Sequence, residues 1–128
     1  MSYLNDFYKV ISSEKTGNSF ISAVFLDKQH PIFGGHFPDN PITPGVCMMQ
    51  IVKELAESHL GSELHLNKVN SVKFAAIVNP FLTPNLRFEL DIQPMEAGVK
   101  IKTLVYMDDT IALKAVEEFS ISPVSYSK

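Results

Sequence analysis

The 128-residue sequence has little cysteine and no runs of basic residues, and each of these absences argues against a class of protein. It contains one cysteine, Cys47, in an apolar run, so a disulfide is a poor explanation for it. We interpret it as a small buried hydrophobic residue rather than a nucleophile. Basic runs are missing, and 11 Lys and Arg against 14 Asp and Glu give a net charge of −3. Because nucleic-acid binding depends on neutralising phosphates, this charge argues against a nucleic-acid partner.

Long apolar segments are missing as well. No apolar run is long enough to cross a bilayer, and the first residues, Met-Ser-Tyr-Leu-Asn-Asp, place no cationic segment before an apolar stretch. These absences predict a cytoplasmic protein with no membrane partner. The chain has no repeats and no Gly/Ser linker, so we expect residues 1–128 to form a single domain.

The most constrained segment of the chain surrounds one histidine, His36. Three prolines, Pro38, Pro41 and Pro44, follow it within eight residues. Each proline fixes its own φ and restricts the residue before it, so this segment is largely pre-set before tertiary contacts form. A histidine held so rigidly is a candidate catalytic base.

A helix start follows this segment directly. Thr43 and Pro44 supply an N-cap hydroxyl and a proline at the first helical position, and Gly45 allows a ligand to approach the free N–H groups. Residues 45–60 form the predicted helix, and Gly61 suits the position just past its end. The sequence therefore predicts a base beside an oxyanion site.

The rest of the chain indicates a mainly antiparallel sheet. Apolar spacing at residues 4–11 predicts a short helical segment, and residues 14–18 predict a turn. The predicted strands are 20–26, 68–74, 86–92, 99–106 and 111–121. The last two separators are short enough for hairpins. We therefore expect an α+β domain in which a curved antiparallel sheet of five to six strands wraps around one long central helix.

Two groups of residues resemble a known family. Gly35-His36-Phe37-Pro38, then Pro41, then Pro44-Gly45-Val46 is similar to the signature of the β-hydroxyacyl-acyl-carrier-protein dehydratases, which have the hot-dog fold. Val72-Lys73-Phe74 with the later Pro80 and Pro84 resembles the family's basic-Phe strand and the turn after it. The resemblance covers about residues 18–120. It implies a hot-dog fold and elimination of water from a 3-hydroxyacyl thioester to give a 2-enoyl thioester.

The resemblance also implies roles for individual residues. His36 falls on the catalytic histidine that takes the α-proton, and the N–H of Gly45 falls on the donor that polarises the thioester carbonyl. Phe37 and Val46 fall beside them as substrate-binding residues. The family's second catalytic residue is a carboxylate on the central helix, supplied by the other subunit of a dimer. At that position this chain has Gln50.

A carboxamide donates a hydrogen bond to the C3 oxygen but cannot hand over a proton, which general-acid catalysis requires. Three alternatives follow for Gln50. His36 performs both proton transfers, a different subunit of a heterodimer supplies the carboxylate, or the chain binds acyl thioesters without turning them over. Glu54, one helical turn further on, lies at the right spacing to stand in, although a turn displaces it by about 5 Å.

These observations leave three functions open. The first is a dehydratase acting on an acyl-carrier-protein or coenzyme A thioester, as a homodimer or higher homo-oligomer, or as one half of a heterodimer. The second is a hot-dog acyl thioesterase in which Gln50 orients a water. The third is a non-catalytic acyl-carrier-binding subunit. We expect no metal and no cofactor, because His30, His59 and His65 are scattered and His36 has only Asp39 near it in sequence.

Overall fold

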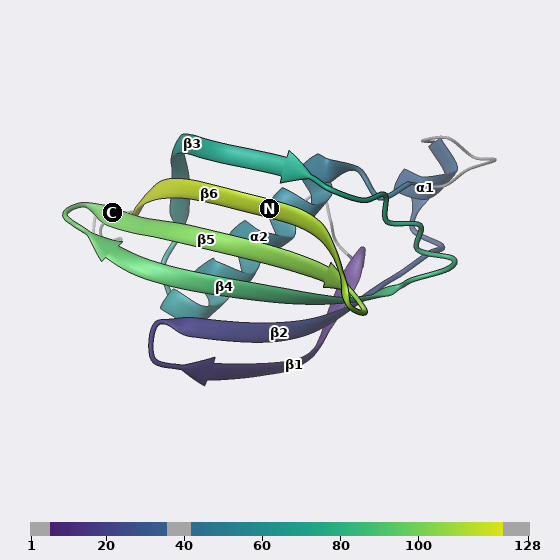
Figure 1. The fold of residues 1–128 in the computed structure, drawn as a ribbon, viewed down its shortest axis with the longest axis horizontal. Helices are drawn as coiled ribbons and strands as arrows, with labels where there is room; N and C mark the ends of the chain where they lie inside the picture. The colour runs from purple at the N-terminus through teal and green to yellow at the C-terminus, as the bar shows by residue number, and fades with distance from the viewer. Residues whose placement is uncertain (1–5, 36–41, 122–128) are drawn as a thin grey trace, which may run out of the picture.

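The structure is a computed structural model that describes residues 6–35 and 42–121. Six strands form one antiparallel sheet in the order β1-β2-β4-β5-β6-β3, which curves around one long helix (Figure 1). The elements are β1 (Tyr8–Thr16), β2 (Ser19–Leu26), α1 (Pro31–Gly35), α2 (Gly45–Leu60), β3 (Leu64–Phe74), β4 (Asn85–Met95), β5 (Gly98–Met107) and β6 (Thr110–Ile121). The predicted α+β architecture is confirmed, with six strands.

The core lies between α2 and the concave face of the sheet. The buried residues of α2 recur at helical spacing and are Cys47, Met48, Ile51, Val52, Leu55 and Ala56. The facing residues of β4 alternate with half-exposed ones and are Leu86, Phe88, Leu90 and Ile92. The reading of Cys47 as a buried, unpaired residue is confirmed.

The prediction of a helix at residues 4–11 is wrong for its described part. β1 begins at Tyr8 and pairs with β2, with a bulge between Val10 and Ser12. Eight residues are too few to separate a helical from a strand period, and the run Tyr-Lys-Val-Ile is rich in strand-forming residues. The predicted turn at 14–18 shortens to Gly17 and Asn18, with Gly17 at φ 61°.

The predicted N-cap is wrong by one residue. α2 begins at Gly45, its N-cap is Pro44 in an extended conformation, and no side chain caps it. Thr43 is instead part of the loop packing, since its N–H donates to the carbonyl oxygen of Val78 at 2.8 Å and its hydroxyl is buried without a hydrogen-bond partner.

The short helix α1 was missed by the sequence reasoning. Its first residue is Pro31, a favoured residue there, and Nδ1 of His30 accepts a hydrogen bond from the N–H of Ile32 at 3.1 Å. Phe7 packs against both sides of this turn, 5.2 Å from the His30 ring and 5.3 Å from Phe33. His30 is therefore a structural residue, as its Pro31 neighbour could have suggested.

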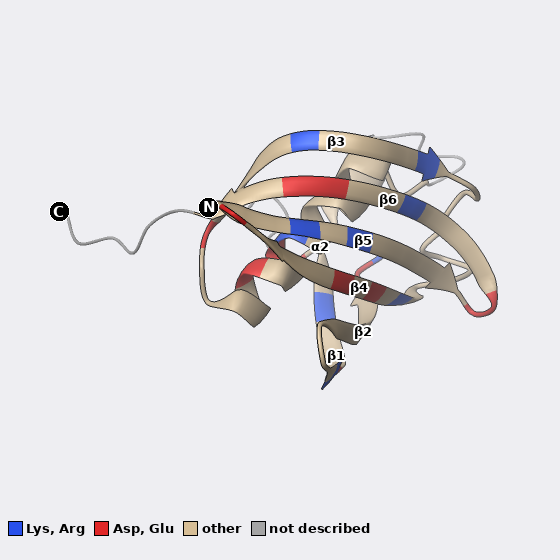
Figure 2. Cartoon of the chain, turned by 60° about the vertical axis from the view of Figure 1, so that its left-hand side comes forward, with Lys and Arg blue, Asp and Glu red and all other residues tan. Residues whose placement is uncertain are grey.

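Neighbouring strands of the sheet carry charged residues of both signs (Figure 2). Asp91 of β4 lies opposite Lys102 of β5, and Lys100 of β5 lies opposite Glu118 of β6. Opposite charges in facing positions stabilise a sheet modestly. These strands therefore carry charge of mixed sign rather than a basic surface.

Candidate functional site

The start of α2 offers backbone donors to a ligand. The first N–H groups of a helix lack the usual partner one turn earlier, and here the N–H of Cys47 is taken up by the carbonyl oxygen of Pro44 at 3.0 Å. The N–H groups of Gly45 and Val46 remain, and no side chain in the described ranges caps them. The helix dipole adds partial positive charge at the same end. Val46 in this first turn is 68% exposed, so the turn is open on one side. This geometry suits a developing negative charge, such as that on a carbonyl oxygen.

Gly45 lies directly beneath an aromatic ring. A Cβ at this position would overlap the ring of Phe74, the last residue of β3. The absence of a side chain therefore lets the end of β3 pack against the helix start. Phe74 is itself 54% exposed, so it forms one wall of an open site.

His36 and Phe37, two of the predicted site residues, lie outside the described residues. The chain is described up to Gly35 at the end of α1 and again from Ile42, just before α2. Their roles stay predictions, whereas Gly45, Val46 and Gln50 are placed on the first two turns of α2.

Gln50 takes part in a chain of side-chain hydrogen bonds. Its Nε2 donates to Oε2 of Glu54 at 3.0 Å, and the other oxygen of Glu54, Oε1, accepts from the hydroxyl of Tyr8 at 2.7 Å. All three residues are part-buried. The expectation that Glu54 shares a face with Gln50 is confirmed, while the part played by Tyr8 was missed. No signal in the sequence indicates a contact between residues 46 positions apart.

The phenol of Tyr8 stays protonated at any ordinary pH. Burial raises its pKa well above the usual range, and the hydrogen bond to the Glu54 carboxyl raises it further. Tyr8 is therefore a permanent donor to Glu54.

A cavity of about 320 Å³ adjoins this chain on the side of β1 and β2. Its lining mixes apolar residues with hydroxyl, carboxyl and imidazole groups: Tyr8, Val10, Ser13, Phe20, Ser22, Glu54, Leu55, Ser58 and His59. Ser13 and Ser22 are hydrogen-bonded at 2.7 Å, and the His59 ring stacks on Phe20 at 4.4 Å. The cavity provides a polar environment on one side of Glu54.

Two further polar side chains are buried in the core without hydrogen-bond partners. They are Thr103 of β5 and Glu117 of β6, and Glu117 is only 2% exposed. Burial raises the pKa of the Glu117 carboxyl from 4.5 to about 7. Glu117 lies opposite Ile101 and Val69 in the sheet and is not in hydrogen-bond contact with Gln50.

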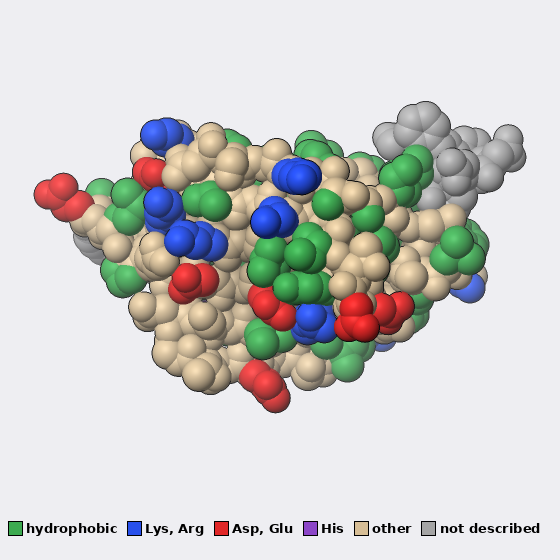
Figure 3. Space-filling view, in the orientation of Figure 1, with side chains coloured by type: hydrophobic (Ala, Val, Ile, Leu, Met, Phe, Trp, Pro, Cys, Tyr) green, Lys and Arg blue, Asp and Glu red, His purple; other side chains and the backbone are tan. Residues whose placement is uncertain are grey.

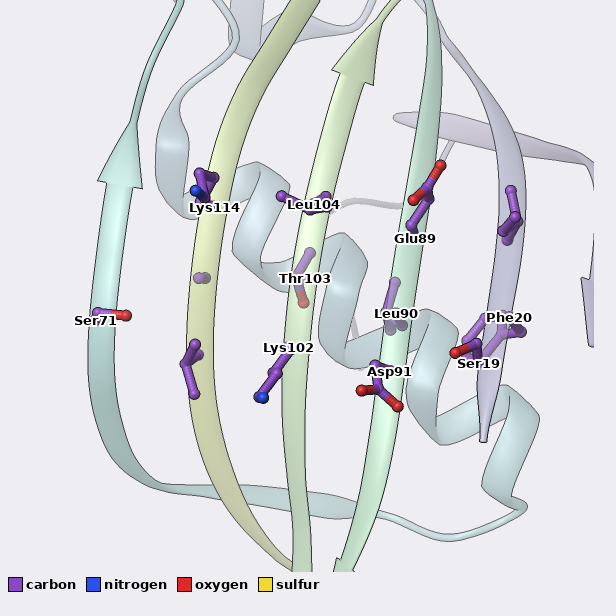
Figure 4. A pocket seen from close by; sticks show the side chains of 13 residues that line it. Ser19, Phe20, Ser71, Glu89, Leu90, Asp91, Lys102, Thr103, Leu104 and Lys114 are labelled. Atoms are coloured by element: carbon purple, nitrogen blue, oxygen red, sulfur yellow. The ribbon is translucent and has the colours of Figure 1, made fainter. Parts of the chain in front are cut away.

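Another hollow lies elsewhere, on the outer face of the sheet. It is a trough of about 570 Å³, and its lining includes Ile21, Leu104, Val116, Lys102 and Lys114. Figure 4 shows Lys102, Leu104 and Lys114 on neighbouring strands of the trough, and Figure 3 shows hydrophobic side chains on this face with Lys and Asp or Glu side chains around them. Figure 4 places these strands between the trough and α2. The trough contains neither the helix start nor Gln50 and is therefore not the predicted site.

Within the described ranges, no three His, Cys, Asp or Glu side chains lie close enough together to hold a metal ion. His59 is stacked on Phe20, and exposed His65 lies 3.5 Å from Glu63. None of the described helices is long and apolar enough to span a bilayer.

Comparison with known proteins assigns the chain to a family. The ApeI-like family, described as ApeI dehydratase, matches residues 12–112. The chain belongs to the ApeI-like dehydratase family. The predicted resemblance to hydroxyacyl dehydratases with the hot-dog fold is thereby confirmed.

Named relatives and solved structures agree with this ApeI-like assignment. The chain is 27% identical over 112 residues to the 3-hydroxyacyl-[acyl-carrier-protein] dehydratase FabZ of Lactobacillus helveticus, covering 82% of this chain and 75% of the relative. The FabZ of Pediococcus pentosaceus is 25% identical over 122 residues, covering 90% and 81%.

Among solved structures, the dehydratase heterocomplex ApeI:P from Xenorhabdus doucetiae superposes with a TM-score of 0.72 at 20% identity, covering 88% of this chain and 96% of that one. A putative thioesterase, yhdA from Lactococcus lactis, also reaches a TM-score of 0.72, at 9% identity, covering 98% and 100%. These two likenesses establish the fold and do not choose between the two activities.

Proposed function

We propose that this ApeI-like protein eliminates water from 3-hydroxyacyl thioesters carried on acyl carrier protein and releases 2-enoyl thioesters. The observation that carries the proposal is the open start of α2, where no described side chain caps the N–H groups. Membership of a dehydratase family and relatives named for this activity support it.

The proposed chemistry follows from the charges that develop during elimination. The thioester oxygen gains negative charge when the C2 proton leaves, and N–H groups at the helix start stabilise that charge. His36 takes the C2 proton. The C3 hydroxyl leaves with a proton returned by His36 and with a hydrogen bond from the Gln50 carboxamide.

We propose that two subunits form this site. β3 is an edge strand of the sheet and exposes apolar side chains, with Leu66 53%, Val69 46% and Phe74 54% exposed. A long apolar edge strand favours pairing with another chain. Because Phe74 at the end of β3 packs on Gly45, a second chain paired there would lie beside the helix start.

The partner can be a second copy or a related chain. The alternative heterodimer, in which another subunit supplies the missing carboxylate, is favoured by Gln50 and is consistent with the heterocomplex nature of the ApeI:P structure. Carrier protein rather than coenzyme A, and a cytoplasmic location, stay predictions.

Activity of His36 variants tests the proposal. Purified protein is incubated with 3-hydroxyacyl carrier-protein thioesters of several chain lengths, and the enoyl product is measured by mass spectrometry. His36→Ala and His36→Gln should abolish the product, while His65→Ala, which changes an exposed histidine, should retain it. Full turnover in the His36 variants would disprove the mechanism, and release of free acid would favour a thioesterase. Light scattering gives the mass of the assembly, and a strict monomer at micromolar concentration would exclude the shared site.

A further inference from the structure

We infer that Glu54 and Tyr8 are positioning residues that fix the orientation of the Gln50 carboxamide. The inference rests on the proposed function, because it concerns the same site. Its basis is the pair of hydrogen bonds to Glu54, from Gln50 Nε2 to Oε2 at 3.0 Å and from Tyr8 to Oε1 at 2.7 Å.

The two ends of a carboxamide have almost the same shape and opposite hydrogen-bonding character. A carboxylate only accepts, so only the NH₂ end of Gln50 can face Glu54. The Gln50 carbonyl oxygen then points away from Glu54, and the second N–H remains for a ligand. A hydrogen bond to a charged group is stronger than a neutral one, so Glu54 holds this orientation firmly.

Tyr8 keeps Glu54 in place for this task. Because its pKa is raised, Tyr8 keeps its proton throughout the ordinary pH range, and its hydroxyl donates a hydrogen bond that holds Oε1 of Glu54 on the side of β1. The other oxygen is thereby directed to Gln50. The first residue of β1 thus helps set the direction of a side chain on α2.

Orientation matters for the proposed elimination because the leaving C3 oxygen needs a donor. If the Gln50 carboxamide were free to turn, its carbonyl oxygen would face the substrate part of the time and repel the leaving hydroxyl. An amide fixed in advance loses less entropy when the transition state forms. Glu54 therefore acts on the reaction through Gln50 rather than by touching substrate.

Glu54→Gln and Tyr8→Phe test the inference with little change in volume. Gln at position 54 can face position 50 with either end, so the orientation of Gln50 is no longer unique. The matched controls are Glu63→Gln, an exposed carboxylate with 70% side-chain exposure, and Tyr106→Phe, whose ring lies on Arg87 at 4.1 Å. We expect kcat to fall about tenfold in Glu54→Gln, less in Tyr8→Phe and not at all in the controls, with KM changed less than twofold.

A direct readout of the amide does not depend on turnover. In ¹⁵N-labelled protein, the side-chain NH₂ signal of Gln50 is assigned by its loss in Gln50→Ala. We expect its two protons to be widely separated in the parent protein, because only one binds a carboxylate, and this separation to collapse in Glu54→Gln. An unchanged NH₂ signal in Glu54→Gln would overturn the inference even if the protein is an active dehydratase.

A double-mutant cycle separates positioning from a general structural effect. If Glu54 acts through Gln50, Glu54→Gln causes no further loss of activity in the Gln50→Ala background. Losses that multiply would overturn the inference. A parent protein that shows no dehydration but has the expected NH₂ signal would count against the proposed function and leave the positioning role intact.

Discussion

The two ends of α2 differ in how their polar groups are satisfied. At the C-terminal end, Gly61 adopts the left-handed conformation and its N–H donates to the carbonyl oxygen of Glu57 at 2.8 Å. The Glu57 side chain accepts from the N–H of Leu64 at 2.8 Å and pairs with Lys53 at 3.3 Å. At the N-terminal end, none of the side chains that the structure describes caps the helix, and the Thr43 hydroxyl is buried without a hydrogen-bond partner.

Under the proposed function, the C-terminal end of α2 is structural and the N-terminal end binds the substrate. Partners at the C-terminal end stabilise the helix and the turn into β3. Free donors at the N-terminal end cost stability and are useful only if a ligand fills them. Substitutions at the N-terminal end should therefore change activity, and substitutions at the C-terminal end should change stability.

The largest expected effect is that of Gly45→Ala. The new Cβ would overlap the Phe74 ring and displace it from the helix start, so we expect kcat/KM for dehydration to fall about 100-fold. The matched change at the other end is Gly61→Ala. There the cost is about 1 kcal/mol of stability from the left-handed φ of 69°, with turnover unchanged. Equal losses of activity at both ends would contradict the comparison.

Gln50→Glu should raise dehydration by about tenfold or more. A carboxyl at position 50 would lie within hydrogen-bond distance of Glu54, since the present atoms are 3.0 Å apart, and two carboxyls so close share a proton. The protonated carboxyl can then serve as a general acid, and general-acid catalysis raises reaction rates by about 10²- to 10⁴-fold. Enoyl product formation measures the gain. No gain in a variant that folds and binds acyl carrier protein normally would make the acyl-carrier-binding subunit the better assignment.

Glu57→Ala should reduce stability and leave activity alone. The change removes the hydrogen-bond acceptor of the Leu64 N–H. Because Leu64 is fully buried, its N–H would be left without a partner, and the free energy of unfolding should fall by about 1 to 2 kcal/mol. Urea denaturation gives this value, and enoyl formation below the transition gives the activity. A clear loss of turnover in folded protein would mean that the C-terminal end also supports the site.

Thr43→Val should have the smallest effect. Valine replaces a buried hydroxyl that has no partner, so the free energy of unfolding should stay the same or rise by less than about 1 kcal/mol. If Thr43 were an N-cap in solution, the same change would instead cost about 1 kcal/mol. The direction of the shift in the urea midpoint distinguishes the two arrangements.

Sequence periodicity predicted the long elements well. The helix was placed at 45–60 with Gly61 after it, and strict alternation located β4 through Leu86, Phe88, Leu90 and Ile92. The helix pattern repeats over several turns, and the β4 pattern alternates strictly between apolar and polar residues, so a sequence displays both directly. The prediction was wrong for a short segment, the start of β1 at Tyr8, because the spacing of its apolar residues fits both a helical and a strand period.

The site was predicted only as far as its local motif. Gly45 and Gln50 are placed on α2 as expected, and Glu54 lies on the same face. The contact of Tyr8 with Glu54 depends on where the tertiary fold places the start of β1 relative to α2, which no short stretch of sequence specifies. The predicted Thr43 cap does not form, and the N–H of Thr43 instead bonds to the carbonyl oxygen of Val78, a tertiary contact that local capping preference does not predict.

The buried carboxyl of Glu117 couples folding to proton uptake. In the unfolded chain its pKa is 4.5, and burial raises it to about 7, so between these values the folded protein holds a proton that the unfolded chain has released. The stabilising contribution is complete below pH 4.5 and declines as the pH rises towards 7. The folded protein therefore takes up a proton relative to the unfolded chain in this pH range, and a rise in pH from 4.5 towards 7 shifts the equilibrium towards the unfolded chain.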